Sequence, residues 1–239
     1  MARKTLKWIA GCVSAVCLAL LLLYISVCVP TYSKWFYNRE YAKNNVYQTI
    51  GISEDELSRV TAHMLRYMRD KEPELNLTAI VNGEKRLFFN DIEIKHMADV
   101  QKLFTVGDVI KNVSAALFLL SGAVFLTVYL KKHRLFLFRC WRNACIASAS
   151  LLLLIGVVVL VDFNGAFTLF HKIFFNNDMW ILDPATDLLI NMVPEQFFID
   201  ISVFIASVFL FLNITLTLAA SGLISSEKKR IRTAHGSRD

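Results

Sequence analysis

Four stretches of this sequence contain no charged residue, and each is long enough to cross a lipid bilayer as a helix. A helix rises about 1.5 Å per residue, so about 20 residues cover the roughly 30 Å of hydrocarbon while satisfying their own backbone hydrogen bonds. With 55% hydrophobic residues and only 9 Gly and 4 Pro, the chain is too apolar for an ordinary soluble domain. It is therefore predicted to be an all-α membrane protein with four transmembrane helices. The uncharged stretches are Trp8–Val29, Val113–Leu130, Ala144–Val161 and Ile201–Ser226.

The four helices divide the other residues between two sides of the membrane, and the charges differ between these sides. Residues 1–7, 131–143 and 227–239 hold 13 basic and two acidic residues, a formal charge of +11, whereas the rest of the chain carries −5. Basic residues concentrate on the cytoplasmic side of membrane proteins, so both termini are predicted to be cytoplasmic, N-in/C-in. The overall charge of +6 then reflects topology and contact with anionic membrane lipid, and no nucleic-acid partner is expected.

This topology defines a domain order that runs from one end of the chain to the other. We expect an N-terminal tail and first membrane helix at 1–29, an extracytoplasmic cap at 30–112, a second membrane helix at 113–130, a basic cytoplasmic loop at 131–143, a third membrane helix at 144–161, an aromatic and acidic extracytoplasmic segment at 162–200, a fourth membrane helix at 201–226 and a basic cytoplasmic tail at 227–239.

The first apolar stretch could instead be a cleaved signal peptide. It is 22 residues long and ends without a small-x-small cleavage site, so a retained anchor is the better interpretation. The segment Ile9–Cys12 looks like a lipoprotein processing box, but no apolar segment precedes it. All five cysteines lie in or beside the predicted spans without a CxxC pair, which indicates packing residues and neither a zinc site nor disulfides.

The cap is long enough to carry structure of its own. Ser53 followed by Glu56 forms a capping box, and helical spacing of apolar residues predicts an amphipathic helix from Ser53 to about Lys71. Asn82-Gly83 between two short strand-like runs predicts a β-hairpin. Asn90 and Asp91 are expected to cap a second helix, Ile92–Phe104. The predicted cap is therefore small and α-helical with one hairpin.

Histidines are the best candidates for chemistry, because motifs of serine hydrolases, zincins, NTPases and dinucleotide-binding enzymes are missing from the sequence. His96 has Glu93 and Asp99 three residues away on either side, on one helix face. A carboxylate partner would orient the imidazole and raise its basicity, although an ordinary solvated Glu-His-Asp face has the same spacing. A metal site would need a second Glu-x-x-His motif, so no metal is expected.

His171 lies in a strongly aromatic part of the second extracytoplasmic segment. An apolar setting beside the membrane favours the neutral imidazole, which can accept a proton. Packing at the interface, as Tyr or Trp side chains do, is an equally good explanation from the sequence alone. His171 and His96 belong to the same side of the predicted topology, so they could meet. His63, His133 and His235 are interpreted as solvated.

At these histidines the chain resembles a known family. The segments Asn90–Val100 and Phe170–Asp187, followed by Pro194-Glu195, are similar to segments of the lipoprotein intramolecular transacylase family of Gram-positive bacteria, and the likeness extends over essentially the whole chain. Members of that family move an acyl chain from the sn-2 ester of a lipoprotein's diacylglyceryl group to the α-amino group of the same N-terminal cysteine, giving a lyso-form lipoprotein. The resemblance implies that His96 and His171 are catalytic and lie where the cap meets the membrane, on the extracellular face. It leaves open which histidine is the general base.

The resemblance also defines the expected surroundings of the reaction. Forming an amide from an ester is downhill, so neither ATP nor a cofactor is expected, and the partners are a diacylglyceryl lipoprotein and membrane lipid, with the protein a monomer. Residues expected to orient the histidines, with loop capping or interface anchoring as the alternative for the last three, are Glu93, Asp99, Asp178, Trp180 and Asp183. Residues expected to line the substrate pocket are Tyr37, Tyr41, Phe170, Phe174 and Phe175.

Two other functions compete with an acyltransferase. A non-enzymatic sensor or assembly factor, whose cap binds a lipid or a partner protein, would tolerate alanine at both histidines. A transporter is disfavoured, because the four spans lack charged residues and Asn213 is their one strongly polar residue.

Overall fold

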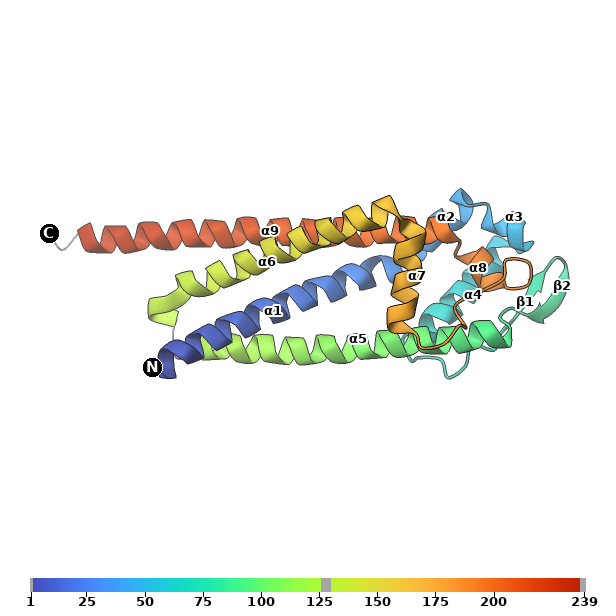
Figure 1. Cartoon of the computed structure of the whole chain (residues 1–239), viewed down its shortest axis with the longest axis horizontal. Coiled ribbons are helices and arrows are strands. Elements are labelled where there is room, and N and C mark those ends of the chain that lie inside the picture. Colours follow the sequence, from blue (N-terminus) through green and yellow to red (C-terminus); the bar gives the residue numbers. More distant parts are fainter. Residues whose placement is uncertain (1, 126–129, 237–239) are drawn as a thin grey trace. The chain divides into compact units, whose positions relative to one another are not determined.

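The computed structural model describes residues 2–125 and 130–236. The described chain divides into two compact units, and each is treated by itself. The first unit contains Met1–Val27, Val109–Val157 and Ala206–Asp239, and the second contains Cys28–Asp108 and Val158–Ile205. Figure 1 labels the helices and the two strands along the chain.

Four long helices are apolar enough to cross a membrane, as the sequence predicts. Their membrane-compatible stretches have mean hydropathies from 1.6 to 2.8. Apolar side chains cover their outer surfaces, with Leu119 70% and Val161 82% exposed. Such surfaces are stable in lipid and not in water. The four helices are α1 (Ala2–Thr31), α5 (Asp91–Val124), α6 (Leu130–Val161) and α9 (Glu195–Gly236).

All four helices extend beyond the predicted membrane spans, and α1 begins six residues before Trp8. The expected helix Ile92–Phe104 is not separate, because α5 continues through Gly107 into the second span. The expected basic loop at 131–143 is helical and forms the beginning of α6. The helix α9 begins six residues before the predicted fourth span and continues to Gly236. The expected end of the second span includes residues 126–129, which lie outside the described residues.

Within the first unit, polar side chains of the helices pair with one another. Nε1 of Trp141 on α6 donates to Oγ of Ser14 on α1 at 2.8 Å. Oγ of Ser148 donates to Oδ1 of Asn213, which is 1% exposed, at 3.0 Å. Hydrogen bonds of this kind remove the cost of burying polar groups in an apolar setting.

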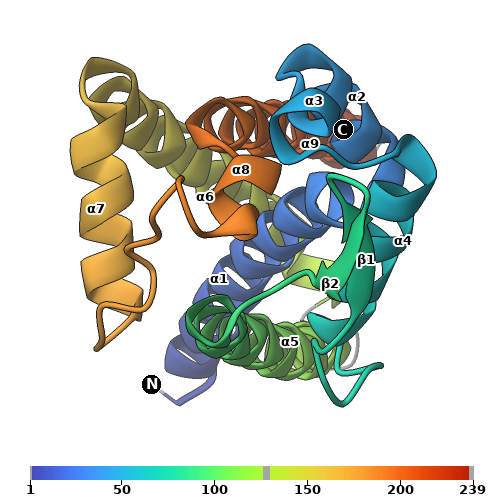
Figure 2. The same cartoon turned by 90° about the vertical axis from the view of Figure 1, so that its right-hand side faces the viewer.

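Local capping signals explain the small elements of the second unit. Oγ of Ser53 accepts a hydrogen bond from Glu56 N, which confirms the predicted cap of α4 (Glu54–Tyr67). The predicted hairpin is also confirmed: β1 (Thr78–Val81) pairs antiparallel with β2 (Glu84–Leu87). Its turn residues Asn82 and Gly83 have φ of 53° and 81°, the left-handed conformation that such a turn requires. Figure 2 shows the hairpin beside α4, to which Arg59 ties it by donating to Thr78 O.

A hydrophobic core joins these elements to the segment before α9. It brings side chains of α2 (Lys34–Lys43), α3 (Val46–Ile50) and α4 together with the hairpin and with α8 (Leu188–Met192). Phe88, which follows β2, and Leu57 on α4 are 0% exposed. Full burial of each large apolar side chain contributes about 1.5–3 kcal/mol. The remaining helix of this unit, α7 (Phe163–Phe174), is capped by Asp162, whose Oδ1 accepts from Gly165 N at 2.8 Å.

Candidate active site

His96 lies on the second turn of α5, in the charged part of that helix that precedes its apolar stretch. The start of the helix is fixed by Asn90, whose Oδ1 accepts from the backbone N–H groups of Ile92 and Glu93 at 3.0 Å each. Carboxylate oxygens of Glu93 accept from the backbone N–H groups of Asn90 and Leu189. These bonds hold the first turn of α5 against the beginning of α8.

His171 lies near the end of α7 and is 7% exposed. Its Nδ1 is 2.7 Å from the backbone carbonyl oxygen of Phe167, one helical turn earlier. A carbonyl oxygen only accepts hydrogen bonds, so Nδ1 is the donor and Nε2 of the neutral ring carries the lone pair. No buried side-chain nitrogen or oxygen among the described residues lacks a hydrogen-bond partner. Nε2 therefore keeps accessible surface and is free to bind a proton.

The two imidazoles lie next to each other in the second unit. Their ring centroids are 6.1 Å apart, with 32° between the ring planes. Phe175 stands against both rings, with its centroid 5.3 Å from that of His96 and 5.5 Å from that of His171. Two residues that are 75 positions apart in the sequence thus converge, with one phenyl ring as a shared wall.

Further aromatic rings surround His171. The centroids of Phe167, Trp180 and Phe170 lie 4.1, 4.8 and 5.5 Å from the centroid of its imidazole. Phe174 packs on Phe170 at 4.7 Å, and the two are 52% and 43% exposed. Of the expected pocket residues, Phe170, Phe174 and Phe175 therefore lie around the histidine pair. Phe167 was not among them, although its position four residues before His171 on one helix face is a signal that could have identified it.

Burial controls the charge of both imidazoles. Burial, and to a smaller extent the neighbouring His171, lower the pKa of His96 to about 4, while the carboxylate of Asp99 opposes this change. The pKa of His171 is also lowered by burial, against the hydrogen bond to Phe167. Both rings are therefore neutral at pH 7. Among the described residues, none forms a hydrogen bond with a ring nitrogen of His96, which leaves both nitrogens available.

The carboxylates beside His96 bond to other groups than its imidazole. Glu93 is 1% exposed and bonds to backbone N–H groups, and burial raises its pKa. Asp99 accepts from Nδ2 of Asn177 at 2.8 Å and from Nζ of Lys102 at 3.0 Å. The hydrogen bond from Asn177 lowers the pKa of Asp99 most, and the bond from Lys102 lowers it further. Both carboxylates thus connect α5 to other groups instead of bonding directly to the ring.

Three aspartates follow His171, and they differ in their surroundings. Asp178 is exposed, and its backbone carbonyl accepts from Ile181 N. Asp183 caps a turn, with Oδ1 accepting from Ala185 N at 2.9 Å. Asp187 is 5% exposed and accepts from Nδ2 of Asn90 at 2.8 Å. Burial would raise the pKa of Asp187, but hydrogen bonds from its neighbours hold it below its usual value. Asp187 was not predicted as a site residue.

Tyr37 and Tyr41, expected in the substrate pocket, are part of the core of the second unit. They are 4% and 1% exposed. The ring of Tyr37 is 5.0 Å from that of Phe197, and the hydroxyl of Tyr41 is 2.9 Å from Oγ1 of Thr61. Both side chains face packed protein in this structure.

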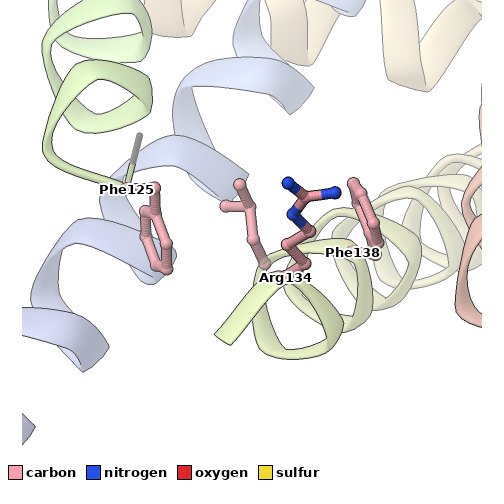
Figure 3. A pocket seen from close by; sticks show the side chains of 4 residues that line it. Phe125, Arg134 and Phe138 are labelled. Carbon is pink, nitrogen blue, oxygen red and sulfur yellow. The ribbon is translucent and has the colours of Figure 1, made fainter. Parts of the chain in front are cut away.

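Two cavities lie in the first unit, and neither is lined by His96 or His171. One of about 290 Å³ is bounded by Phe125, Arg134, Leu137 and Phe138 (Figure 3). The other, of about 510 Å³, lies between apolar side chains of α1 and α5. Within residues 2–125 and 130–236, no group of three or more His, Cys, Asp or Glu side chains is arranged to hold a metal ion.

Fold and site together define a class: a multi-pass membrane protein with two neutral imidazoles in an aromatic site, an arrangement suited to acid–base chemistry. A model of the family described as lipoprotein intramolecular transacylase Lit matches residues 12–198, and the chain belongs to that family. The membrane-integral Lit of Bacillus cereus has a similar fold, with a TM-score of 0.77 at 20% identity over 95% of this chain and 99% of that one. A variant of that protein with one histidine replaced by alanine gives a TM-score of 0.75 at 19% identity, covering 95% of this chain and 97% of the other.

A sequence relative is known from another organism. An uncharacterized protein of Aquifex aeolicus (strain VF5) is 28% identical over 194 residues, which is 79% of this chain and 84% of that protein.

Proposed function

We propose that this protein transfers the sn-2 acyl chain of a diacylglyceryl-modified lipoprotein to the α-amine of the lipoprotein's N-terminal cysteine, with His96 and His171 as the catalytic acid and base. The observation that carries the proposal is the pair of neutral imidazoles 6.1 Å apart, in a chain that belongs to the Lit family. In the reaction the ester C–O bond breaks and an amide C–N bond forms. One proton of the amine ends on the glyceryl oxygen, so no other reactant is needed.

His171 has the properties of the general base in this proposal. An α-amine has a pKa of about 7.7–8.0 and is mostly protonated at neutral pH, so a base must remove a proton before the amine attacks. The bond from Nδ1 to Phe167 O fixes the tautomer of His171 and directs the lone pair to Nε2. A base whose orientation is fixed in advance loses little entropy when it engages the substrate.

His96 has the properties of the proton donor. Its two unbonded nitrogens allow either tautomer, so one N–H can stabilise the oxyanion of the tetrahedral intermediate. Its pKa of about 4 makes its protonated form a strong acid, which protonates the departing glyceryl oxygen readily. The neighbouring His171 lowers the pKa of His96, so the pair holds one proton at a time and passes it from amine to leaving group.

The exposed surface of α7 supports a lipid as the substrate. Leu169, Phe170, Ile173 and Phe174 are 59%, 43%, 65% and 52% exposed on this helix. Such a continuous apolar surface beside His171 matches acyl chains. Rings around the imidazoles also exclude water, which would otherwise hydrolyse the ester.

We further propose that the site faces the outside of the cell and both termini face the cytoplasm. The support is the charge division of the sequence, +11 on one set of segments and −5 on the others. A cysteine-labelling experiment with a membrane-impermeant reagent at the exposed Asp178 and at Arg232, each replaced by cysteine in a cysteine-free background, tests this orientation. Labelling of intact cells at position 178 alone is expected, and labelling at position 232 alone would reverse the topology.

The decisive experiment joins the protein with its substrate. Expression beside a diacylglyceryl lipoprotein is expected to shift one acyl group onto the cysteine nitrogen, as detected by mass spectrometry of the N-terminal peptide. The variants His96→Ala and His171→Ala should express at wild-type levels and leave the peptide unchanged. Turnover by both variants would refute the catalytic role of the two histidines. An unchanged peptide with well-expressed wild-type protein would refute the transacylase and favour the non-enzymatic sensor or assembly factor.

A further inference from the structure

We infer that Asp99 and Asn177 form a positioning clasp, which places the segment after α7 so that His171 stays opposite His96. The inference rests on the proposed function, because it assigns these two residues a part in that reaction without contact with the reacting atoms. Neither residue is a hydrogen-bond partner of an imidazole among the described parts of the chain.

The clasp joins segments that are far apart in sequence. Asp99 is on α5, one turn beyond His96, and Asn177 is three residues beyond the end of α7. Nδ2 of Asn177 donates to Oδ2 of Asp99 at 2.8 Å. It is a charge-assisted bond, which is about twice as strong as a bond between neutral groups.

Asn177 also uses its other polar atom. Its Oδ1 accepts from the backbone N–H of Met179 at 3.0 Å, so one amide group holds both α5 and the backbone next to Trp180. Trp180 in turn contacts the imidazole of His171 in a tilted arrangement, with centroids 4.8 Å apart and planes at 31°. A continuous series of contacts therefore leads from Asp99 through Asn177 and Trp180 to His171.

A second connection at the other side of His96 makes the arrangement two-sided. Nδ2 of Asn90 donates to Asp187, and Glu93 accepts from Leu189 N. His96 thus lies between two places where α5 is bonded to the segment after α7. With both ends held, this segment keeps Phe175 and Trp180 against the imidazoles.

The donor and the carboxylate of the clasp can be exchanged between positions 99 and 177 by mutation, which gives a sharp test. The variant Asn177→Asp keeps the acceptor for Met179 N but sets a carboxylate against Asp99, and it should reduce acyl transfer on the order of 10²-fold, the effect of about 1 Å of misplacement. Adding Asp99→Asn restores a donor and a carboxylate in exchanged places, and it should recover most of the activity. Asp99→Asn alone keeps a neutral hydrogen bond and should have a smaller effect than Asn177→Asp.

If acyl transfer required the charge of Asp99 itself, the activities of these variants would follow the opposite order. In that case Asp99→Asn and the double variant would both be impaired, and Asn177→Asp would remain active; this result would overturn the clasp. Lys102→Met is the matched control, because it removes the other partner of Asp99 and leaves the clasp intact, and its activity should match that of the wild type.

Amide hydrogen exchange separates failure of the clasp from failure of the proposed function. Exchange at Ile181, whose N–H donates to Asp178 O in the segment held by the clasp, should be faster in Asn177→Asp and slow again in the double variant, whether or not the protein transfers acyl chains. Absence of acyl transfer by the wild type with this exchange pattern would refute the function and keep the clasp. Unchanged exchange across all variants would refute the clasp.

Discussion

Acidification should destabilise the wild-type protein through His96, and replacing that residue by phenylalanine should remove this effect. The folded protein keeps His96 neutral down to a pKa of about 4, while the unfolded chain protonates it near 6.5. The unfolded state therefore binds more protons between these values, and stability is lost as the pH falls through this window. Groups that face His96 include His171, which adds to the loss, and Asp99, which opposes it.

The size of the effect follows from the two pKa values. Between pH 7 and pH 5, linkage gives a loss of about 2 kcal/mol from His96, and the full difference between the protonation states is about 3 kcal/mol. His96→Phe suits the site, because the nearest ring to His96 is Phe175, at 5.3 Å. The variant should therefore gain about 2 kcal/mol relative to the wild type between pH 7 and pH 5.

Denaturation of the purified proteins in detergent at a series of pH values measures this difference. Taking the variant minus the wild type cancels the acid response of carboxylates shared by both proteins. A difference that stays constant from pH 7 to pH 5 would refute the reasoning, because it would mean that His96 is protonated as readily in the folded protein as in the unfolded chain.

Three other substitutions test the surroundings of the site. Tyr41→Phe removes the hydroxyl that bonds to Thr61, so the free energy of unfolding, measured by denaturation, should fall by about 1 kcal/mol. Turnover in the peptide assay should stay at the wild-type level, and lost turnover would indicate that Tyr41 belongs to the substrate pocket. Gly51 has a φ of 70°, and the Cβ added by Gly51→Ala would lie 1.8 Å from Oδ1 of Asn82 in the hairpin turn. We therefore expect a lower unfolding midpoint for this variant, and an unchanged midpoint would refute the expected strain. Trp180→Ala removes the ring that contacts His171 and should reduce turnover about tenfold with little change in substrate KM. Kinetics equal to those of the wild type would exclude a role of Trp180 in positioning His171.

Local signals allowed much of the fold to be predicted from the sequence. Ser53 and Asn82-Gly83 predict a cap and a turn because their effects depend on neighbours within three residues. The four spans follow from uninterrupted apolar runs. Some of the predicted helix ends were wrong, because the residues that indicated an end do not interrupt the helix. Gly107 costs a helix about 1 kcal/mol, which the length of α5 absorbs.

Charge misled the prediction at 131–143 for a related reason. Basic residues mark the edge of the membrane, but a helix is free to continue beyond that edge into water, and this segment contains neither Gly nor Pro. α7 was not predicted, because residues 162–200 were expected only as an aromatic and acidic extracytoplasmic segment.

The histidine pair was anticipated, but the partners of its neighbours were not. Spacing placed Glu93 and Asp99 on the face of His96, and that placement says nothing about bonds to residues far along the chain. In the structure these carboxylates bond to Leu189 and Asn177, 96 and 78 positions away. Spacing within one helix therefore placed the two carboxylates near His96 and could not assign their roles.

The group that orients His171 is a main-chain atom, the carbonyl oxygen of Phe167. A carbonyl oxygen does not titrate, so the orientation of this imidazole is insensitive to acid, unlike that of a histidine held by a carboxylate. It is also present in every amino acid, so no single substitution at position 167 deletes it. A mutational scan would register position 167 only through its aromatic ring, and the atom that sets the tautomer would remain invisible to it.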